Sequence, residues 1–378
     1  MKFRVGITGQ AGFVGYHLYR TLALKEQIEL VPFERSFFSN DKVLATFVKS
    51  CDVIVHLAAM NRHEDANVIY ETNIALVKTL ITACIKEKVS PHIIFSSSSQ
   101  EVNDNLYGKS KKEGKHLFME WADKGNGKVT SLTIPNVFGP FGKPNYNSVV
   151  ATFCHKIANN EEPTIINDSE VGLIYINNLV SRFINVIEGK IETENIGKNS
   201  YELLIAPETH IKVSKILSLL KQYKSDYMGK GIFPSLEDSF EKALFNTFRC
   251  YVPKDHYPVK YTKHTDARGS FVEIARTETS GQFSFSTTVP GITRGNHYHT
   301  RKAERFAVIS GKALIQLRKI GTDEVIDYYL DGAEPAYVDM PIWYTHNIKN
   351  IGNEELITLF WINEPYNEKD ADTYFENV

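Results

Sequence analysis

The sequence predicts two domains: an α/β domain with a Rossmann-type, doubly wound parallel sheet, followed by an all-β barrel of the jelly-roll type. Three observations predict it. Strand-like and helix-like runs alternate up to about residue 140, glycines follow the first strand at helix-opening spacing, and short β-rich runs without long helices begin near residue 260. We expect the first domain over residues 1–247, a linker over 248–262 and the barrel over 263–378.

The elements of the first domain follow from its hydrophobic periods. Apolar runs predict strands over 3–8, 28–33, 53–57, 92–96 and 129–134, and amphipathic stretches predict helices over 12–23, 41–50, 69–88 and 110–123. A more mixed stretch over about 140–245 would bind substrate. In the barrel, strands are expected over 270–276, 282–289, 304–310, 312–319, 325–330, 336–340 and 356–362.

Composition excludes several classes of protein. The 378 residues are 42% hydrophobic, enough for two cores, and the net charge of -2 argues against nucleic acid or an anionic membrane as the partner. We expect no membrane span and no secretion signal. The four cysteines are widely spaced and form no CxxC pair, so reduced thiols in a cytoplasmic protein are the expectation.

Glycines at residues 9, 12 and 15 follow the first predicted strand and open the first predicted helix. This spacing lets the backbone approach a pyrophosphate, whose charge the helix N-terminus stabilises. The second strand ends in Glu34 and Arg35; an acid would bind the ribose hydroxyls of NAD, and an arginine the 2′-phosphate of NADP. Arg35 favours NADPH, although a solvated surface arginine is an equally simple reading.

A run of serines, Ser96–Ser99, ends one strand and is followed by Tyr107 and Lys111. A Tyr-x-x-x-Lys pair on a helix places both side chains on one face. The lysine ammonium is expected to lower the pKa of the phenol. Tyr107 could then donate a proton to a carbonyl oxygen while a hydride arrives from nicotinamide.

These motifs resemble the extended short-chain dehydrogenase/reductase family, which also implies a nucleotide-sugar substrate. The resemblance implies a catalytic trio of Ser98, Tyr107 and Lys111, with Ser97 or Ser99 as alternatives to Ser98. Two departures are Thr133, where arginine is common, and asparagines at 177–178, where aspartates are usual. The dinucleotide site implied by the resemblance comprises Gly9, Gln10, Gly12, Phe13, Val14, Gly15, Arg35, Leu57, Ala58, Ala59, Asn73, Ser96, Tyr107, Lys111 and Pro135.

The barrel carries a second cluster. His297 and His299 project to one face of a strand, Glu304 begins the next strand, and His346 arrives from a later one. Imidazoles with one carboxylate form a good divalent-metal set, and zinc is the first expectation. The spacing resembles the two motifs of the cupin family, although Trp343 replaces a glycine of the second.

The segments 266–273 and 293–297 also resemble the dTDP-4-keto-6-deoxy-sugar 3,5-epimerase family, itself a cupin. That family uses a histidine base at the place of His297, so the two resemblances disagree; we favour His297 as a ligand. The sequence does not choose among four candidate proton carriers, Tyr298, Tyr344, Lys302 and His264.

Together, the two halves resemble bifunctional enzymes of capsular polysaccharide synthesis. The resemblance implies epimerisation at carbon 3 of a UDP-2-acetamido-2,6-dideoxy-4-keto-hexose in the barrel. Reduction of carbon 4 with NADPH would then give UDP-2-acetamido-2,6-dideoxy-L-talose, on the route to UDP-N-acetyl-L-fucosamine, by a homodimer. Three alternatives remain: an NAD-retaining 4-epimerase or dehydratase, a barrel that only binds sugar or dimerises, and a metal that only closes the barrel.

Overall fold

The computed structural model describes residues 2–256, 259, 261–279 and 281–378, which fall into two compact units. The first unit contains residues 2–221 and 239–253, and the second contains Gln222–Asp238 together with the described residues from Lys254 onward. Residues 222–238, expected in the first domain, therefore group with the barrel. Of the linker expected over 248–262, residues 257, 258 and 260 lie outside the described residues.

A seven-stranded sheet organises the first unit in the order β2-β1-β3-β4-β5-β9-β8. Its strands are parallel except for β8, which pairs antiparallel with β9. Since β1 lies between β2 and β3, the strand order reverses beside β1, where α/β sheets bind ligands. The strands are β1 (Phe3–Thr8), β2 (Ile28–Val31), β3 (Val53–His56), β4 (His92–Ser98), β5 (Lys128–Ile134), β8 (Glu194–Asn195) and β9 (Ser200–Leu204).

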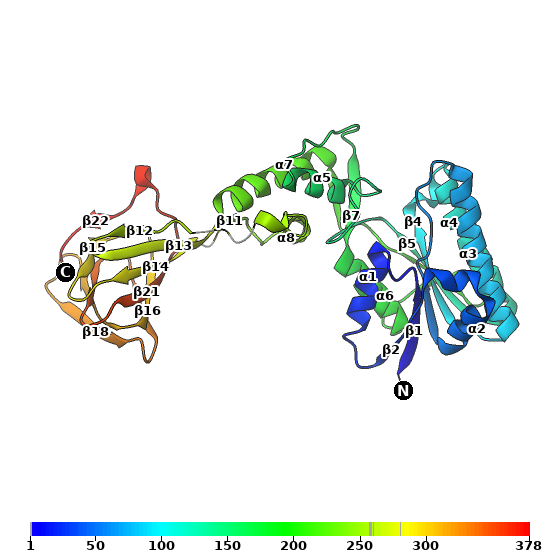
Figure 1. Ribbon diagram of the computed structural model, residues 1–378, viewed down its shortest axis with the longest axis horizontal. Helices are drawn as coiled ribbons and strands as arrows, with labels where there is room; N and C mark the ends of the chain where they lie inside the picture. The colour runs from blue at the N-terminus through cyan, green and yellow to red at the C-terminus, as the bar shows by residue number, and fades with distance from the viewer. Residues whose placement is uncertain (1, 257–258, 260, 280) are drawn as a thin grey trace. The chain divides into compact units, whose positions relative to one another are not determined.

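Helices cover both faces of this sheet (Figure 1). One buried core joins the sheet to α1 (Phe13–Leu22) and α6 (Ile176–Ile187), and another joins it to α2 (Asp41–Ser50), α3 (Ala66–Glu87) and α4 (Leu106–Trp121). The remaining elements of this unit are β6 (Asn136–Phe138), α5 (Val149–Ala158), β7 (Glu170–Tyr175), β10 (Thr209–Lys212), α7 (Val213–Tyr223) and α8 (Ser239–Arg249). Strands β10, β7 and β6 form a second, three-stranded sheet.

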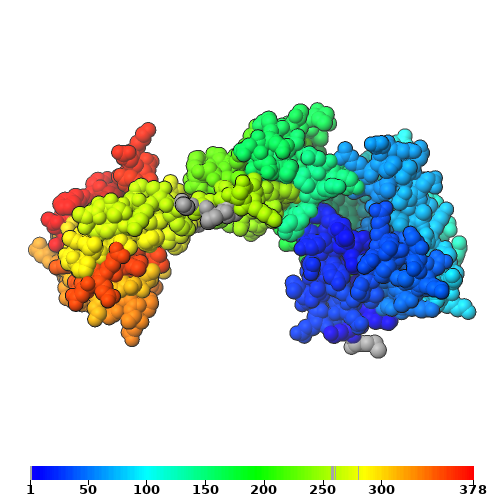
Figure 2. Space-filling model, viewed as in Figure 1, coloured from blue at the N-terminus to red at the C-terminus, as the bar shows by residue number. Residues whose placement is uncertain are grey.

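Two sheets form the barrel of the second unit, and their strands are antiparallel except for β11, which pairs parallel with β13. One has the order β11-β13-β14-β21-β16-β19 with β12 beside β13, and the other has the order β18-β17-β20-β15-β22. In Figure 2 the side chains of each unit are drawn in full. The strands are β11 (Ile232–Phe233), β12 (His264–Asp266), β13 (Gly269–Thr277), β14 (Gly281–Thr288), β15 (Thr293–Tyr298), β16 (Glu304–Ser310), β17 (Lys312–Lys319), β18 (Val325–Asp331), β19 (Ala336–Met340), β20 (Tyr344–Asn350), β21 (Leu356–Ile362) and β22 (Tyr374–Phe375).

The predicted fold class is confirmed, and most strand bounds agree within two residues. One helix bears on the expectation of no membrane span: α3 has 22 residues, and an 18-residue stretch of it has a mean hydropathy of 1.4, so it is long and apolar enough to cross a membrane by length and composition alone. Its residues Ile69, Ile74, Val77 and Leu80 are buried in the domain core, and the core helix of a globular protein passes the same test.

Candidate active sites

The glycine loop after β1 has no room for side chains. Gly12 donates its N–H to the carbonyl of Gly9 at 2.9 Å and begins α1 as its N-cap. A Cβ on Gly15 would stand 2.2 Å from the carbonyl oxygen of Gly9, and one on Gly9, whose φ is +79°, would stand 2.9 Å from the nitrogen of Ala58. The close approach of loop, helix and β3 therefore requires glycine and leaves the N–H groups of α1 open to a pyrophosphate.

A cavity of about 1020 Å³ opens from this loop. It runs along the carboxyl ends of β3, β4 and β5 and reaches the segment after β6. The predicted residues that line it are Gly9, Gly12, Phe13, Val14, Gly15, Leu57, Ala59, Ser96, Ser98, Tyr107, Lys111 and Pro135. The structure thus brings the glycine loop and the Ser-Tyr-Lys residues to a single cavity.

Four residues of the predicted dinucleotide site lie outside this lining, as far as the structure is described: Gln10, Arg35, Ala58 and Asn73. Asn73 is buried, exchanges two hydrogen bonds with the backbone of Met60 and donates to Ser110 at 2.9 Å. It therefore braces the loop after β3 against α4. Gln10 likewise accepts from the nitrogen of Phe33 at 3.3 Å, and Arg35 is exposed at the start of the short 3-10 helix η1 (Arg35–Ser39) that follows β2.

Tyr107 and Lys111 lie in the first two turns of α4, which Asn105 caps by accepting from the nitrogen of Gly108 at 2.7 Å. Lys111 is buried, and its Nζ donates to the carbonyl of Ser96 at 2.8 Å. That Nζ lies 5.9 Å from the centre of the Tyr107 ring. Ser98 lies close enough to Tyr107 to influence the pKa of its phenol, and all three side chains line the same cavity, so serine, tyrosine and lysine form one constellation.

The expectation that Tyr107 has a lowered pKa is not met. Burial, reinforced by the neighbouring Tyr146, raises the pKa of Tyr107 to about 12, while the hydrogen bond from Ser98 opposes the rise. Burial lowers the pKa of Lys111 to about 8. Desolvation is thus the largest cause of both pKa shifts. A phenol that stays protonated at neutral pH is suited to donate a proton.

Glu101, the acid after the serine run, does not line the cavity. Its Oε1 lies 3.5 Å from the Nζ of Lys115 and accepts from the hydroxyl of Thr133 at 3.3 Å. Glu202 on β9 pairs with Lys115 and Thr133 as well. A dehydratase needs an acid facing the sugar, and Glu101 is instead paired with Lys115.

The sequence motifs assign no role to several residues that line the cavity. These are Tyr16 and His17 of α1, Asn136, and Phe141, Lys143, Tyr146 and Asn147 of the segment after β6. His17 stacks on Phe141 with ring centres 5.9 Å apart and hydrogen-bonds the carbonyl of Pro140 at 2.9 Å. These residues have no periodicity and join segments more than 100 residues apart, so no local signal identifies them.

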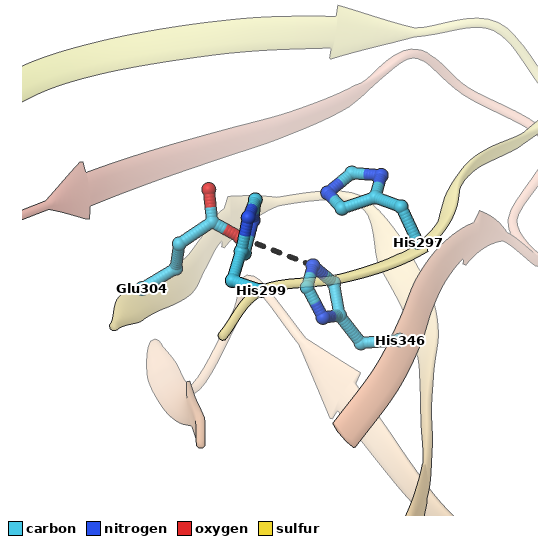
Figure 3. Close-up of side chains that lie close together, drawn as sticks. All are labelled: His297, His299, Glu304 and His346. Atoms are coloured by element: carbon cyan, nitrogen blue, oxygen red, sulfur yellow. Dashed lines mark ion pairs between the residues drawn. The ribbon is translucent and has the colours of Figure 1, made fainter. Parts of the chain in front are cut away.

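The second site lies in the barrel, where the four predicted ligands converge (Figure 3). The candidate ligand atoms of His297, His299, Glu304 and His346 all lie within 4.8 Å of one another. His297 on β15 pairs directly with His346 on β20, after a register shift that begins at Gly295, while Glu304 starts β16 in the opposite sheet. The cluster therefore joins the two sheets of the barrel.

The donor atoms of this cluster fit a divalent ion. The Nδ1 atoms of His299 and His346 contact the carbonyls of Asp372 at 2.5 Å and Tyr344 at 3.3 Å, and carbonyls can only accept. In the neutral ring, Nδ1 therefore carries the proton and Nε2 presents its lone pair toward Glu304. Metal-bound histidines adopt this arrangement. Both Nε2 atoms are buried against the Oε2 of Glu304, which lies 3.3 Å from that of His299 and 3.0 Å from that of His346.

The charges of the cluster are coupled through Glu304. Burial opposes ionisation of Glu304, but contacts with His299 and His346 hold the pKa of its carboxyl below the usual range. Burial lowers the pKa of His297 to about 4, whereas at His299 burial is outweighed by the contacts with Glu304 and Asp372, which raise the pKa. Because a divalent ion requires neutral imidazoles and an ionised carboxylate, it would take the place of the proton that Glu304 favours on His299.

The four candidate proton carriers differ in position. Tyr344 stands two residues before His346 on β20 and shares its face, whereas Tyr298 alternates away from His297 and stacks on Trp343 and Tyr374. Lys302 is buried and donates to the carbonyl of Ala371 at 2.7 Å. His264 is exposed on β12. Geometry favours Tyr344.

Comparison with known proteins covers both units. Residues 5–197 match the NAD dependent epimerase/dehydratase family, and residues 264–374 match the polysaccharide biosynthesis C-terminal domain. A UDP-2-acetamido-2,6-beta-L-arabino-hexul-4-ose reductase of Pseudomonas aeruginosa is 36% identical over 375 residues, 98% of each chain. The crystal structure of CapF, a capsular polysaccharide assembling protein of Staphylococcus aureus, superposes with a TM-score of 0.85 at 35% identity, over 99% of this chain and 100% of that one.

A third relative matches only part of the chain. The spore coat polysaccharide biosynthesis protein SpsL of Bacillus subtilis is 27% identical over 123 residues, which are 30% of this chain and 82% of SpsL. The chain belongs to the NAD dependent epimerase/dehydratase family, with a polysaccharide biosynthesis C-terminal domain, and is similar over its whole length to CapF and the Pseudomonas reductase.

Proposed function

We propose that this chain is a bifunctional nucleotide-sugar enzyme. The barrel epimerises carbon 3 of a UDP-2-acetamido-2,6-dideoxy-4-keto-hexose, and the first unit reduces the carbon 4 ketone with NADPH. The product is UDP-2-acetamido-2,6-dideoxy-L-talose, a precursor on the route to UDP-N-acetyl-L-fucosamine in capsule or O-antigen synthesis. One observation carries the proposal: a Ser98-Tyr107-Lys111 constellation lines the dinucleotide cavity of a chain that resembles a reductase of such a ketone over 98% of its length.

In the reduction, Tyr107 donates its phenolic proton to the ketone oxygen as the carbon beside it accepts a hydride. Bound NADPH supplies that hydride from its nicotinamide ring. Ser98 shares the hydrogen bond to the same oxygen. Lys111, held by the carbonyl of Ser96, stabilises the phenolate that remains.

In the epimerisation, a base removes the proton on carbon 3, and the resulting enolate is protonated from the opposite face. We assign one of these transfers to Tyr344, which shares the face of His346. The residues His297, His299, Glu304 and His346 would hold a divalent ion, with zinc as the first candidate. Such an ion would polarise the ketone oxygen or organise the site.

Arg35 supports NADPH over NADH. It is exposed at the start of η1, four residues after β2, and its guanidinium forms no ion pair in the part of the chain that the structure describes, so it is free to meet a 2′-phosphate. The neighbouring Glu34 accepts from Ser36 at 3.4 Å instead. The preference for NADPH is tested by the ratio of kcat/KM for NADPH to kcat/KM for NADH, measured in wild type and in Arg35→Ala. The substitution should lower this ratio.

Two further assignments complete the proposal. The chain works in the cytoplasm, where the four cysteines, all free, would stay reduced. It works as a homodimer, which the exposed outer face of the barrel sheet supports: Phe283, Leu359 and Tyr337 share this face and are 49%, 37% and 57% exposed. Light scattering coupled to gel filtration tests the dimer.

The test of the function uses the pure enzyme, the keto sugar and NADPH in heavy water. NADPH consumption together with deuterium at carbon 3 is expected. NADPH oxidation without exchange would refute the epimerase role, and exchange without oxidation would refute the reductase role.

An NAD-retaining 4-epimerase or dehydratase, with the barrel as a sugar-binding or dimerisation module, is the alternative. The position of Glu101 outside the cavity speaks against a dehydratase. Tightly bound NAD in the purified protein would favour this alternative over ours.

A further inference from the structure

The segment Phe141–Ser148, between β6 and α5, borders the cavity and belongs to no helix or strand. Hydrogen bonds from other parts of the chain nevertheless hold it at several points. Tyr251 donates to the carbonyl of Gly142 at 2.6 Å, and Arg62 donates to the carbonyls of Asn145 at 2.7 Å and Tyr146 at 3.0 Å. Asn145 in turn donates its N–H to Thr152 at 2.9 Å. The segment is therefore a preformed wall, because its backbone is held from three other parts of the first unit.

This wall stands beside the reducing centre. Tyr146 lines the cavity together with Tyr107 and is close enough to contribute to the raised pKa of that phenol. The ammonium of Lys143 lies over the Tyr146 ring, 5.1 Å from its centre. Ring and ammonium thus fix each other, as cation–π pairs do.

The charges of the cavity are few. Among the described residues that line it, only Lys111 and Lys143 carry a full charge at neutral pH. Lys111 is buried and bonded to the carbonyl of Ser96. Lys143 is exposed and forms no ion pair with any acid within the described ranges.

A ternary complex of the proposed reductase needs two diphosphates in this one cavity. The glycine loop and the N-terminus of α1 suit the pyrophosphate of the dinucleotide, since they offer backbone N–H groups at close approach. The second diphosphate, that of the nucleotide sugar, needs its own counter-charge. Of the two lysines, only Lys143 is available to provide it.

We propose that Lys143, set in the fastened segment Phe141–Ser148, binds the diphosphate of the nucleotide sugar and thereby determines specificity for nucleotide-linked over free sugars. This inference rests on the proposed function, because it assigns a residue to its substrate. Tyr146 holds the ammonium in place, and Arg62 positions the segment.

The test measures binding of UDP and of uridine by calorimetry, with the enzyme saturated with NADP⁺ so that the glycine loop is filled. A charge-assisted hydrogen bond to phosphate accounts for about tenfold to hundredfold in affinity. Lys143→Met should lose that much affinity for UDP and none for uridine. Lys143→Arg should retain UDP affinity within about threefold, because the charge remains.

Lys42→Met, which removes an exposed lysine of α2 outside the cavity, is the matched control and should bind UDP as wild type does. Ionic strength gives a second readout: UDP affinity should fall with salt in wild type and much less in Lys143→Met. A purely structural role of Lys143 would instead weaken uridine and UDP alike.

Three results would overturn the inference: unchanged UDP affinity in Lys143→Met, equal loss for uridine, or loss of NADP⁺ affinity in place of UDP affinity. The first of these would leave the proposed function intact. If wild type binds another nucleoside diphosphate through Lys143 but not UDP, the diphosphate site stands and the proposed substrate falls. If wild type binds no nucleoside diphosphate, both fall.

Discussion

Replacing Glu304 with Gln tests the metal centre most directly. The side chain is 8% exposed, and its carboxylate is the one anionic donor among the four converging residues. At free zinc one hundred times the Kd, binding stabilises the folded barrel by about 2.7 kcal/mol. For a domain of roughly 100 residues this corresponds to a rise in Tm of about 10 °C.

Loss of the anionic ligand should weaken zinc binding by ~100-fold, the upper range found for changes around metal ligands. The same zinc concentration then equals the Kd of Glu304→Gln, so the stabilisation falls to about 0.4 kcal/mol and the rise in Tm to about 2 °C. The measurement is thermal unfolding of chelator-treated protein with and without added zinc. The zinc response is compared rather than Tm itself, because the substitution also alters the metal-free barrel.

Glu273→Gln is the matched control, since it removes the same charge from a half-exposed site on β13 that pairs with Arg276. Its zinc response should equal that of wild type. If zinc leaves the Tm of wild type unchanged, or raises that of Glu304→Gln by the full 10 °C, the four residues do not form a metal site and the reasoning from their converging donor atoms is wrong.

Three further predictions concern the first unit. Tyr107→Phe should lower kcat for NADPH oxidation by about 10²–10⁴-fold while deuterium exchange at carbon 3 continues in the barrel; simultaneous loss of exchange would contradict two separate sites. Gly15→Ala places a Cβ 2.2 Å from the carbonyl of Gly9 and should weaken NADPH binding about tenfold to hundredfold in a fluorescence titration. Gly229→Ala, whose Cβ would meet its nearest neighbour at 3.7 Å, should bind as wild type does. Burial lowers the pKa of His56 to about 3 from 6.5, so its stabilisation is complete above pH 6.5 and is lost as pH falls toward 3, by on the order of 4 kcal/mol. His56→Asn should therefore lose less stability than wild type between pH 7 and pH 4, as measured by the midpoint of urea unfolding. If the midpoints of both proteins fell equally with pH, His56 would not be buried as a neutral ring.

The fold could be predicted because periodicity is a local property. Strands β1, β16, β17, β19 and β21 have the bounds that alternation in the sequence predicts. Helix α4 begins at Leu106 and not at residue 110, where the apolar period predicts its start, because the side chain of Asn105 caps the preceding turn. That difference matters, since it places Tyr107 in the first turn of the helix.

Contacts between distant segments could not be predicted in the same way. Asp372, through its backbone carbonyl, fixes His299 from 73 residues away, and its carboxylate accepts from the backbone of Thr300, Arg301 and Lys302. These bonds, against the effect of burial, lower the pKa of Asp372 to about 2, so its charge holds the turn after β15. Nothing near Asp372 in the sequence indicates this role.

The chemistry of the two sites imposes an order on them. A proton on carbon 3 is acidic only while carbon 4 is a ketone, because the enolate places its charge on that oxygen. Once Tyr107 has delivered a proton to the oxygen and the ketone is an alcohol, the barrel has no substrate. Epimerisation must therefore precede reduction, and each reduction removes one epimer from the equilibrium. An enzyme with an intact barrel and Tyr107→Phe should accordingly leave a mixture of two ketones, whereas the complete chain should give one alcohol.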